Sequence, residues 1–277
     1  KWNLMAFNID FSASAQFKGH NQKPLWLADG RGLFRPSLQA ITEKAISRGL
    51  DAVVLRSYSH PNGTDNRWQH YLEEAREKED FSLLGGASPE ATIVYRPRTN
   101  STQKPLILVH GQGLQTDKGD IQVLFAERQV GLRKPNYVSN FDYLIDEARD
   151  AGEGVIVTAS KPYNWIEKDL RKVDAIEIHN GVDSADNNLK AFGLSRRLRI
   201  PGIVVSDSKC LADLGTSYTR FRGDLDNQMR YNQQAVSEML KRELREDISS
   251  AIISSSTLSK VLTGLAVLEV KLTGNVD

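Results

Sequence analysis

The sequence contains a single cysteine, Cys210, and only five histidines among its 277 residues. One cysteine excludes a disulfide within the chain and is typical of a reducing compartment, so we expect a cytoplasmic protein. No apolar run approaches the roughly 18 residues that a membrane-spanning helix needs. The first residues do not resemble a signal peptide either, and we expect no contact with a membrane.

An excess of one charge is also missing, because 36 Lys and Arg residues balance 35 Asp and Glu residues to a net charge of +1. A chain with so little net charge is not drawn to nucleic acid by its field, so a nucleic-acid partner is not indicated. Hydrophobic residues make up 40% of the chain, which is enough for a sizeable core. The length suits one large α/β barrel or two modest domains.

Short apolar runs alternate with amphipathic stretches along most of the chain. We predict strands at residues 4–9, 51–55, 91–95, 106–110, 121–125, 155–157, 175–178 and 203–205. We predict helices at residues 37–48, 64–78, 141–151, 165–170 and 187–199. Strands that alternate with helices through short links are typical of parallel βα units. In barrels of this kind the functional groups follow the strands, at their carboxyl ends.

The C-terminal part of the chain has a different character. A long helix is predicted at residues 226–246 and a last apolar segment at residues 261–272, with a serine-rich link between them. We therefore divide the chain into a barrel at residues 1–223 and a mainly helical appendage at residues 224–277. The long helix is a candidate docking arm for a protein partner or for a second copy of the chain in a homo-oligomer.

Polar residues stand at or just after the ends of several predicted strands. Glu177, His179, Asn180 and Asp207 are candidate site residues on this ground. The clearest stretches are Glu177-Ile178-His179-Asn180-Gly181 and Ser206-Asp207-Ser208-Lys209. His110 also ends an apolar run, and we interpret it as a strand-end polar group or a surface residue.

These stretches resemble the strand ends of the PHP superfamily, the polymerase-and-histidinol-phosphatase metallohydrolases. The resemblance covers roughly residues 4–221 and is strongest between Leu144 and Thr219. It implies an α/β fold, a distorted (β/α)7 barrel of the TIM type. In that family, histidines and carboxylates at the strand ends hold metal ions, and a metal-bound water attacks a phosphate ester.

The histidines that bind metal in that family are missing here. By the resemblance, Asp10 and Ser12 take the places of the histidines of the first strand, and Tyr58 replaces the histidine of the second. Lys161 replaces the histidine of a His-Pro pair, and Lys209 replaces the last one. Lysine ammonium groups repel a divalent cation, so we expect neither a metal nor another cofactor, and we assign no catalytic residue.

Two functions remain open. The first is a catalytically degenerate protein, a pseudoenzyme that acts as a binding, scaffold or interaction module and holds a phosphate or another anionic small molecule between Lys161 and Lys209. The alternative is a phosphoesterase with a rebuilt site, in which Asp10, Glu177 and Asp207 hold one ion or act without metal. Carboxylates paired with the two lysines would favour the first function. Carboxylates that face an ion without a nearby ammonium group would favour the second.

Overall fold

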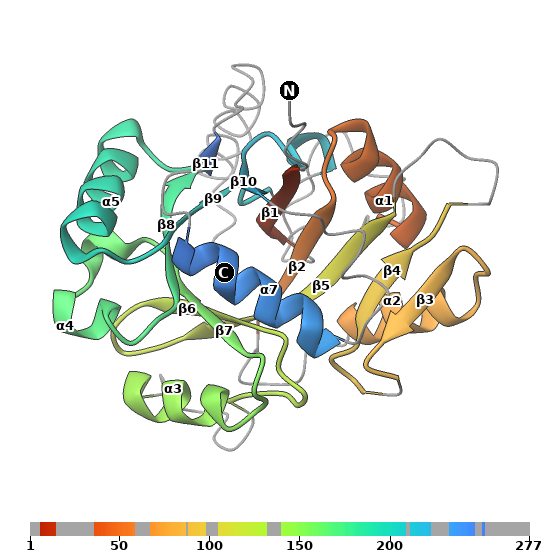
Figure 1. Cartoon of the computed structure of the whole chain (residues 1–277), viewed down its shortest axis with the longest axis horizontal. Coiled ribbons are helices and arrows are strands. Elements are labelled where there is room, and N and C mark those ends of the chain that lie inside the picture. Colours follow the sequence, from red (N-terminus) through yellow and green to blue (C-terminus); the bar gives the residue numbers. More distant parts are fainter. Residues whose placement is uncertain are drawn as a thin grey trace, which may run out of the picture.

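The computed structural model describes residues 6–14, 36–58, 67–86, 88–97, 105–131, 140–208, 211–222, 233–246 and 251–252. Within these ranges the strands form one mixed sheet that curls into a nearly closed barrel, and most of the described helices lie around its outer side (Figure 1). The predicted α/β fold, a distorted barrel, is confirmed. The apolar segment predicted at residues 261–272 lies outside the described residues, as do Lys209 and Cys210.

Most strands of the barrel run in one direction. These parallel strands are β1 (Ala6–Ser14), β2 (Ala52–Tyr58), β5 (Leu106–Gln115), β7 (Ile156–Ala159), β8 (Ala175–Asn180) and β9 (Gly202–Val205). The antiparallel strands are β6 (Asp120–Leu124), β10 (Tyr218–Arg222), β11 (Ala251–Ile252) and the hairpin of β3 (Phe81–Leu84) and β4 (Thr92–Tyr95). The order around the barrel is β11-β10-β1-β2-β5-β6-β7-β8-β9, and the hairpin pairs with the first half of β5.

Three of the described helices begin at polar residues that cap them. The described helices are α1 (Leu38–Ser47), α2 (Arg67–Arg76), α3 (Phe141–Arg149), α4 (Glu167–Leu170), α5 (Ala185–Leu198) and α7 (Gln233–Glu246), with 3-10 turns η1 (Pro162–Asn164) and η2 (Leu211–Asp213). Side chains of Ser37, Asn140 and Ser184 accept hydrogen bonds from backbone N–H groups in the first turns of α1, α3 and α5. Such caps satisfy N–H groups that the helix itself leaves without a partner. None of the described helices has the length and apolar character that crossing a membrane requires.

Alternation along the strands separates the two sides of the sheet. On β2, Val54 faces the interior of the barrel, whereas Val53 and Leu55 face outward against α1 and α2. Successive side chains of a strand point to opposite sides. Arg56 is therefore placed inside the barrel and Ser57 outside it.

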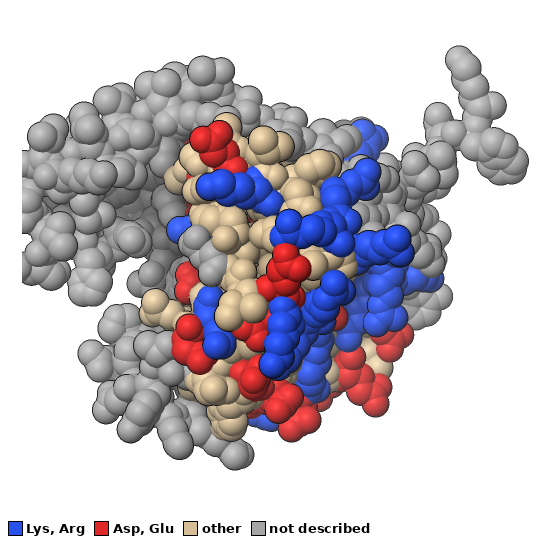
Figure 2. Space-filling model, turned by 90° about the vertical axis from the view of Figure 1, so that its left-hand side faces the viewer, with Lys and Arg blue, Asp and Glu red and all other residues tan. Residues whose placement is uncertain are grey.

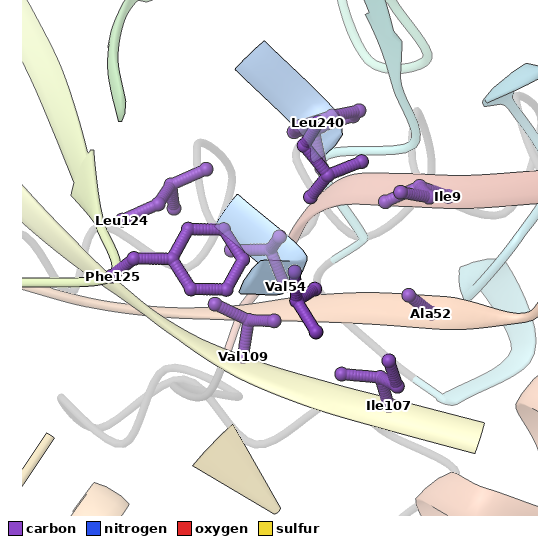
Figure 3. Close-up of a pocket in the computed structure, with 10 residues that line it drawn as sticks. Ile9, Ala52, Val54, Ile107, Val109, Leu124, Phe125 and Leu240 are labelled. Carbon is purple, nitrogen blue, oxygen red and sulfur yellow. The ribbon is translucent and has the colours of Figure 1, made fainter. Parts of the chain in front are cut away.

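The amino end of the barrel interior is filled by apolar side chains. There α7 packs Val236 and Leu240 onto the strands (Figure 3). The layer beneath the helix consists of Ile9, Phe11, Ala52, Val54, Ile107, Val109, Leu124 and Phe125. The helix predicted at residues 226–246 thus shares the core of the barrel through its described part, while the division of the chain at residue 223 stays a prediction.

Side chains close the barrel between β9 and the β1–β10 pair. On β10, Thr219 Oγ1 accepts a hydrogen bond from Val204 N at 2.7 Å and donates one to Val204 O at 3.2 Å. On β1, the Asp10 carboxylate is completely buried and accepts hydrogen bonds from Ser206 N at 3.1 Å, Ser206 Oγ at 2.5 Å and Gly215 N at 3.1 Å. Asp10 therefore links the first strand, by hydrogen bonds, to the segments that follow β9.

The face formed by α3, α4 and α5 carries many Lys and Arg side chains, with Asp and Glu among them (Figure 2). Some of these charges form ion pairs, such as Arg197 with Glu167 and Lys172 with Asp142. Exposed ion pairs contribute little to stability because water and salt screen them. We interpret this face as a solvated surface of mixed charge.

Candidate functional site

The interior of the barrel becomes polar toward the carboxyl ends of its parallel strands. On β2 the inward positions change from Val54 to Arg56, and on β8 they change from Ala175 to Glu177. Thr158 on β7 adds a buried hydroxyl to the same layer. These groups lie at the end of the barrel where βα barrels keep their functional residues.

An ion pair spans this polar layer from β2 to β8. Arg56 Nη1 lies 3.7 Å from Glu177 Oε1, and the two side chains are 4% and 1% exposed. Ser160 Oγ donates a hydrogen bond to Glu177 Oε1 at 2.7 Å, and Asn180 Nδ2 donates one to Oε2 at 3.4 Å. Burial raises the pKa of Glu177 above its ordinary value, against the attraction of Arg56, which lowers it. The Glu177 carboxylate is therefore buried where its charged form is unfavourable, and Arg56 partly offsets this cost.

The raised pKa of Glu177 makes part of the stability depend on pH. The folded chain binds this proton more tightly than the unfolded chain, so the stabilising contribution is complete below the ordinary pKa of 4.5 and is lost as pH rises through the raised value. Glu177→Gln cannot ionise, and we expect it to gain stability relative to the wild type as pH rises from about 4 to about 8. Urea unfolding across this range measures the difference, and a difference independent of pH would contradict the raised pKa.

Among the described residues, the ion-pair partner of Glu177 is a residue that the sequence analysis did not name. The structure pairs Glu177 with Arg56, whereas Lys161 is exposed directly after β7, with left-handed backbone at φ 48°. Lys209 lies outside the described residues, so its contacts remain a prediction. Sequence reasoning missed Arg56, although the alternation that places Val54 inward also points to a charged residue inside the barrel.

The first strand contributes less to this layer than the resemblance implied. Asp10 lies on the opposite side of β1 from Ile9 and Phe11, which belong to the interior core, and its carboxylate closes the barrel. Ser12 and Tyr58 lie at the ends of β1 and β2, but their side chains are outside the described part of the structure. Of these three candidates, only Asp10 has a described side chain, and its carboxylate bonds to the segment after β9.

Three other predicted residues lie at the ends of β8 and β9. The Asn180 amide, which contacts Glu177, also donates a hydrogen bond to Asp207 Oδ2 at 3.2 Å. Asp207 has left-handed backbone, at φ 46°. A bulge in β8 separates Glu177 from His179, whose Nε2 lies 3.4 Å from Ser217 Oγ. The structure therefore brings Glu177, Asn180 and Asp207 together, and places His179 against Ser217.

Inside the barrel, the side chain of Gln122 packs closely against Gly111. Gln122 Nε2, from β6, donates a hydrogen bond to Phe11 O at 3.1 Å. A Cβ added to Gly111 on β5 would lie 2.1 Å from that nitrogen and 2.7 Å from Val54 Cγ1. The polar layer needs glycine at this position, because any side chain would displace Gln122 or the core.

Gly111→Ala is therefore expected to lower the free energy of unfolding by about 1 to 3 kcal/mol, the usual effect of overpacking a core. Gly193→Ala on the exposed side of α5, where no atom lies within 4 Å of the added methyl group, is the matched control. It should stabilise the chain by about 0.5 to 1 kcal/mol through helix propensity. Urea unfolding of both variants checks the opposite signs, and equal effects would contradict the close packing around Gly111.

The fold has known counterparts, although no family model and no curated protein matches the chain. PsfC from Pseudomonas syringae PB-5123 is similar at 14% identity with a TM-score of 0.61, over 97% of this chain and 99% of PsfC. The lesion-specific endonuclease PfuEndoQ from Pyrococcus furiosus is similar at 14% identity with a TM-score of 0.50, over 86% of this chain and 56% of the endonuclease. The fold is PHP-like. Identities this low show the fold alone.

The described residues of this PHP-like barrel do not fit the metal centre that the family implies. Among them, no group of three or more His, Cys, Asp or Glu side chains is placed to hold a metal ion. The Arg56 guanidinium lies beside the Glu177 carboxylate instead. A cation there repels any metal ion that Glu177 would bind.

Proposed function

We propose that this PHP-like chain is a catalytically degenerate binding module. In this proposal the ion pair of Arg56 and Glu177 stands where the family keeps metal ions, and an anion such as a phosphate monoester binds at the carboxyl end of the barrel. The observation that carries the proposal is the buried pair at 3.7 Å. Arginine supplies a permanent positive charge in place of a metal ion. Its guanidinium also pairs with the Glu177 carboxylate, which a metal ion would need as a ligand.

Two buried hydroxyl groups, one on β7 and one after β9, support a ligand at the carboxyl end of the barrel. Thr158 Oγ1 and Ser208 Oγ have no hydrogen-bond partner among the described residues. A buried polar atom without a partner costs about 1 to 3 kcal/mol, and an oxygen of a bound anion or a water would recover that cost. Lys161 and Asp207, after β7 and β9, both have left-handed backbone, a strain that tends to persist where a site needs it.

A phosphoesterase with a rebuilt carboxylate site is the second candidate. Asn180 contacts both Glu177 and Asp207, and the charge of Asp207 contributes to the raised pKa of Glu177. A neighbouring pair of carboxyl groups, one of them with a raised pKa, can act as a general acid and a general base. The position of Arg56 favours the binding module over this alternative.

Binding and hydrolysis distinguish the two candidates. We expect inorganic phosphate and phenyl phosphate to bind in isothermal titration calorimetry, and Lys161→Ala to weaken the binding, with Lys190→Ala on α5 as a matched exposed control. We expect no hydrolysis of bis(p-nitrophenyl) phosphate with or without manganese. Turnover that Glu177→Gln abolishes would overturn the binding module in favour of the enzyme. If the chain showed neither binding nor turnover, both candidates would be overturned.

A scaffold or interaction role is a further form of the same proposal. It would require a protein partner or a second copy of the chain. Separately, we propose a cytoplasmic location, because the chain has a single cysteine. The mass of the protein in solution, by sedimentation, tests the second copy directly. If the protein were a monomer at all concentrations, the proposed second copy would be overturned, and the binding module would act without self-assembly.

A further inference from the structure

A second polar cluster lies on the outer side of the sheet, away from the barrel interior. Ser57 Oγ lies 2.5 Å from His110 Nε2, and His110 Nδ1 contacts Glu90 Oε2. The three residues are buried, with exposures of 5%, 7% and 6%. His110 is therefore a buried, bonded residue of the outer core, more deeply placed than the surface position considered from the sequence.

The direction of these hydrogen bonds follows from the chemistry of the three groups. An ionised carboxylate only accepts hydrogen bonds, so Glu90 requires the proton of His110 on Nδ1. A neutral imidazole with its proton on Nδ1 leaves Nε2 as an acceptor. The hydroxyl of Ser57 then donates to Nε2. This is the order of roles in a nucleophile, base and acid triad, which is recognised by geometry and not by sequence position.

Each member of the cluster is held by the fold. Strands β2 and β5 pair in parallel with Leu55 opposite His110, which sets Ser57 one step further along the same outer side. Trp68 of α2 stacks on the His110 ring, with centroids 5.1 Å apart and planes inclined by 5°. The turn that carries Glu90 is tied to α2, because Gln69 Nε2 donates a hydrogen bond to Pro89 O at 2.8 Å.

The stacked tryptophan adds a donor beside the cluster. Trp68 is 1% exposed, and its Nε1 has no hydrogen-bond partner among the described residues. A buried N–H without an acceptor is unfavourable until a ligand or a water accepts from it. The cluster therefore gathers four polar groups, from β2, β5, α2 and the turn before β4. Among the described residues, the Trp68 Nε1 donor has no acceptor.

We propose that Ser57, His110 and Glu90 form a second site, of the serine-hydrolase type, for a carboxylic ester. Ser57 Oγ bonds to the acyl carbon while its proton passes to His110 Nε2. The bond from the acyl carbon to the ester oxygen breaks, and the leaving alcohol takes that proton. Water then attacks the acyl-serine with His110 as base, which releases the acid and restores Ser57. This proposal is independent of the proposed anion site, because the two sites lie on opposite sides of β2.

A fluorophosphonate probe tests this site in the whole 277-residue chain. We expect the wild type to gain the mass of one phosphonyl group, and peptide mapping to place the adduct on Ser57. His110→Gln and Glu90→Gln should slow labelling by about 100-fold or more, the range of general-base catalysis. Ser82→Ala, which removes a strand hydroxyl outside the cluster, should label at the wild-type rate.

The mapping on wild-type protein keeps the test decisive even if a variant fails to fold. A folded wild type, verified by circular dichroism, that acquires no adduct on Ser57 would overturn the proposal. An adduct that persists in Ser57→Ala would overturn it as well. A purely structural hydrogen-bonded chain would change the unfolding midpoint of the variants and leave the wild type unlabelled.

Discussion

Replacing Arg56 with methionine is expected to lower the free energy of unfolding by about 3 to 5 kcal/mol at neutral pH, the usual cost of leaving one partner of a buried ion pair alone. Methionine keeps much of the length of the side chain and removes its charge, so Glu177 would remain buried and would lose the cation that the described residues place beside it. The loss should be smaller at acidic pH, because Glu177, whose pKa is already raised, then takes up a proton. Chemical unfolding at two pH values measures both effects.

The double variant Arg56→Met with Glu177→Leu is the matched control. Replacement of a whole buried pair by apolar side chains is often neutral or stabilising, so we expect the double variant to recover most of the stability that the single variant loses. An Arg56→Met protein as stable as the wild type would contradict the buried pair. A double variant no better than the single one would mean that volume, and not charge, sets the effect.

Asp10→Asn should have the second large effect, a loss of about 3 kcal/mol or more in the free energy of unfolding, since hydrogen bonds to a charged group contribute about 1.5 to 3 kcal/mol each. The Asp10 carboxylate accepts hydrogen bonds from Ser206 N, Ser206 Oγ and Gly215 N. An asparagine presents an NH2 group to at least one of these donors, which then has no acceptor. The edge between β1 and β9 should open, with faster amide exchange in the segments it joins.

Asp146→Asn on the exposed side of α3 is the control for Asp10. It removes the same charge without breaking a buried contact, and we expect little change in stability. If the two variants were equally stable, the closure of the barrel would not depend on Asp10. Hydrogen exchange followed by mass spectrometry locates any loosening and separates local opening from global unfolding.

Most of the predicted strands and helices coincide with described elements, because they are signalled locally, whereas β3 and β10 were not predicted and β5 runs beyond residue 110 to Gln115. Continuous apolar runs such as residues 51–55 and 203–205 mark buried parallel strands, and polar caps mark the starts of α1, α3 and α5. The grouping of Glu177, Asn180 and Asp207 also follows from local order, since β8 and β9 are neighbours joined by one helix.

Contacts across the barrel could not be predicted in the same way. Arg56 and Glu177 lie on strands that are far apart both in the sequence and in the order of the sheet, and only the curvature of the sheet brings them together. Ser57 and His110 are 53 residues apart, and their contact depends on the register of β2 against β5. Lysine and arginine carry the same charge, so composition alone gave no reason to choose Arg56 over Lys161 as the partner of Glu177.

Metal content is the measurement that tests the central proposal most directly, namely that an ion pair stands where the PHP resemblance implies metal ions. The purified chain would be incubated with manganese and zinc, freed of excess metal and analysed by elemental mass spectrometry. We expect fewer than about one tenth of an ion per chain, because a guanidinium beside Glu177 disfavours a divalent cation. One or more tightly held ions per chain, lost in Glu177→Gln, would contradict the claim and return the chain to the metal-dependent phosphoesterases.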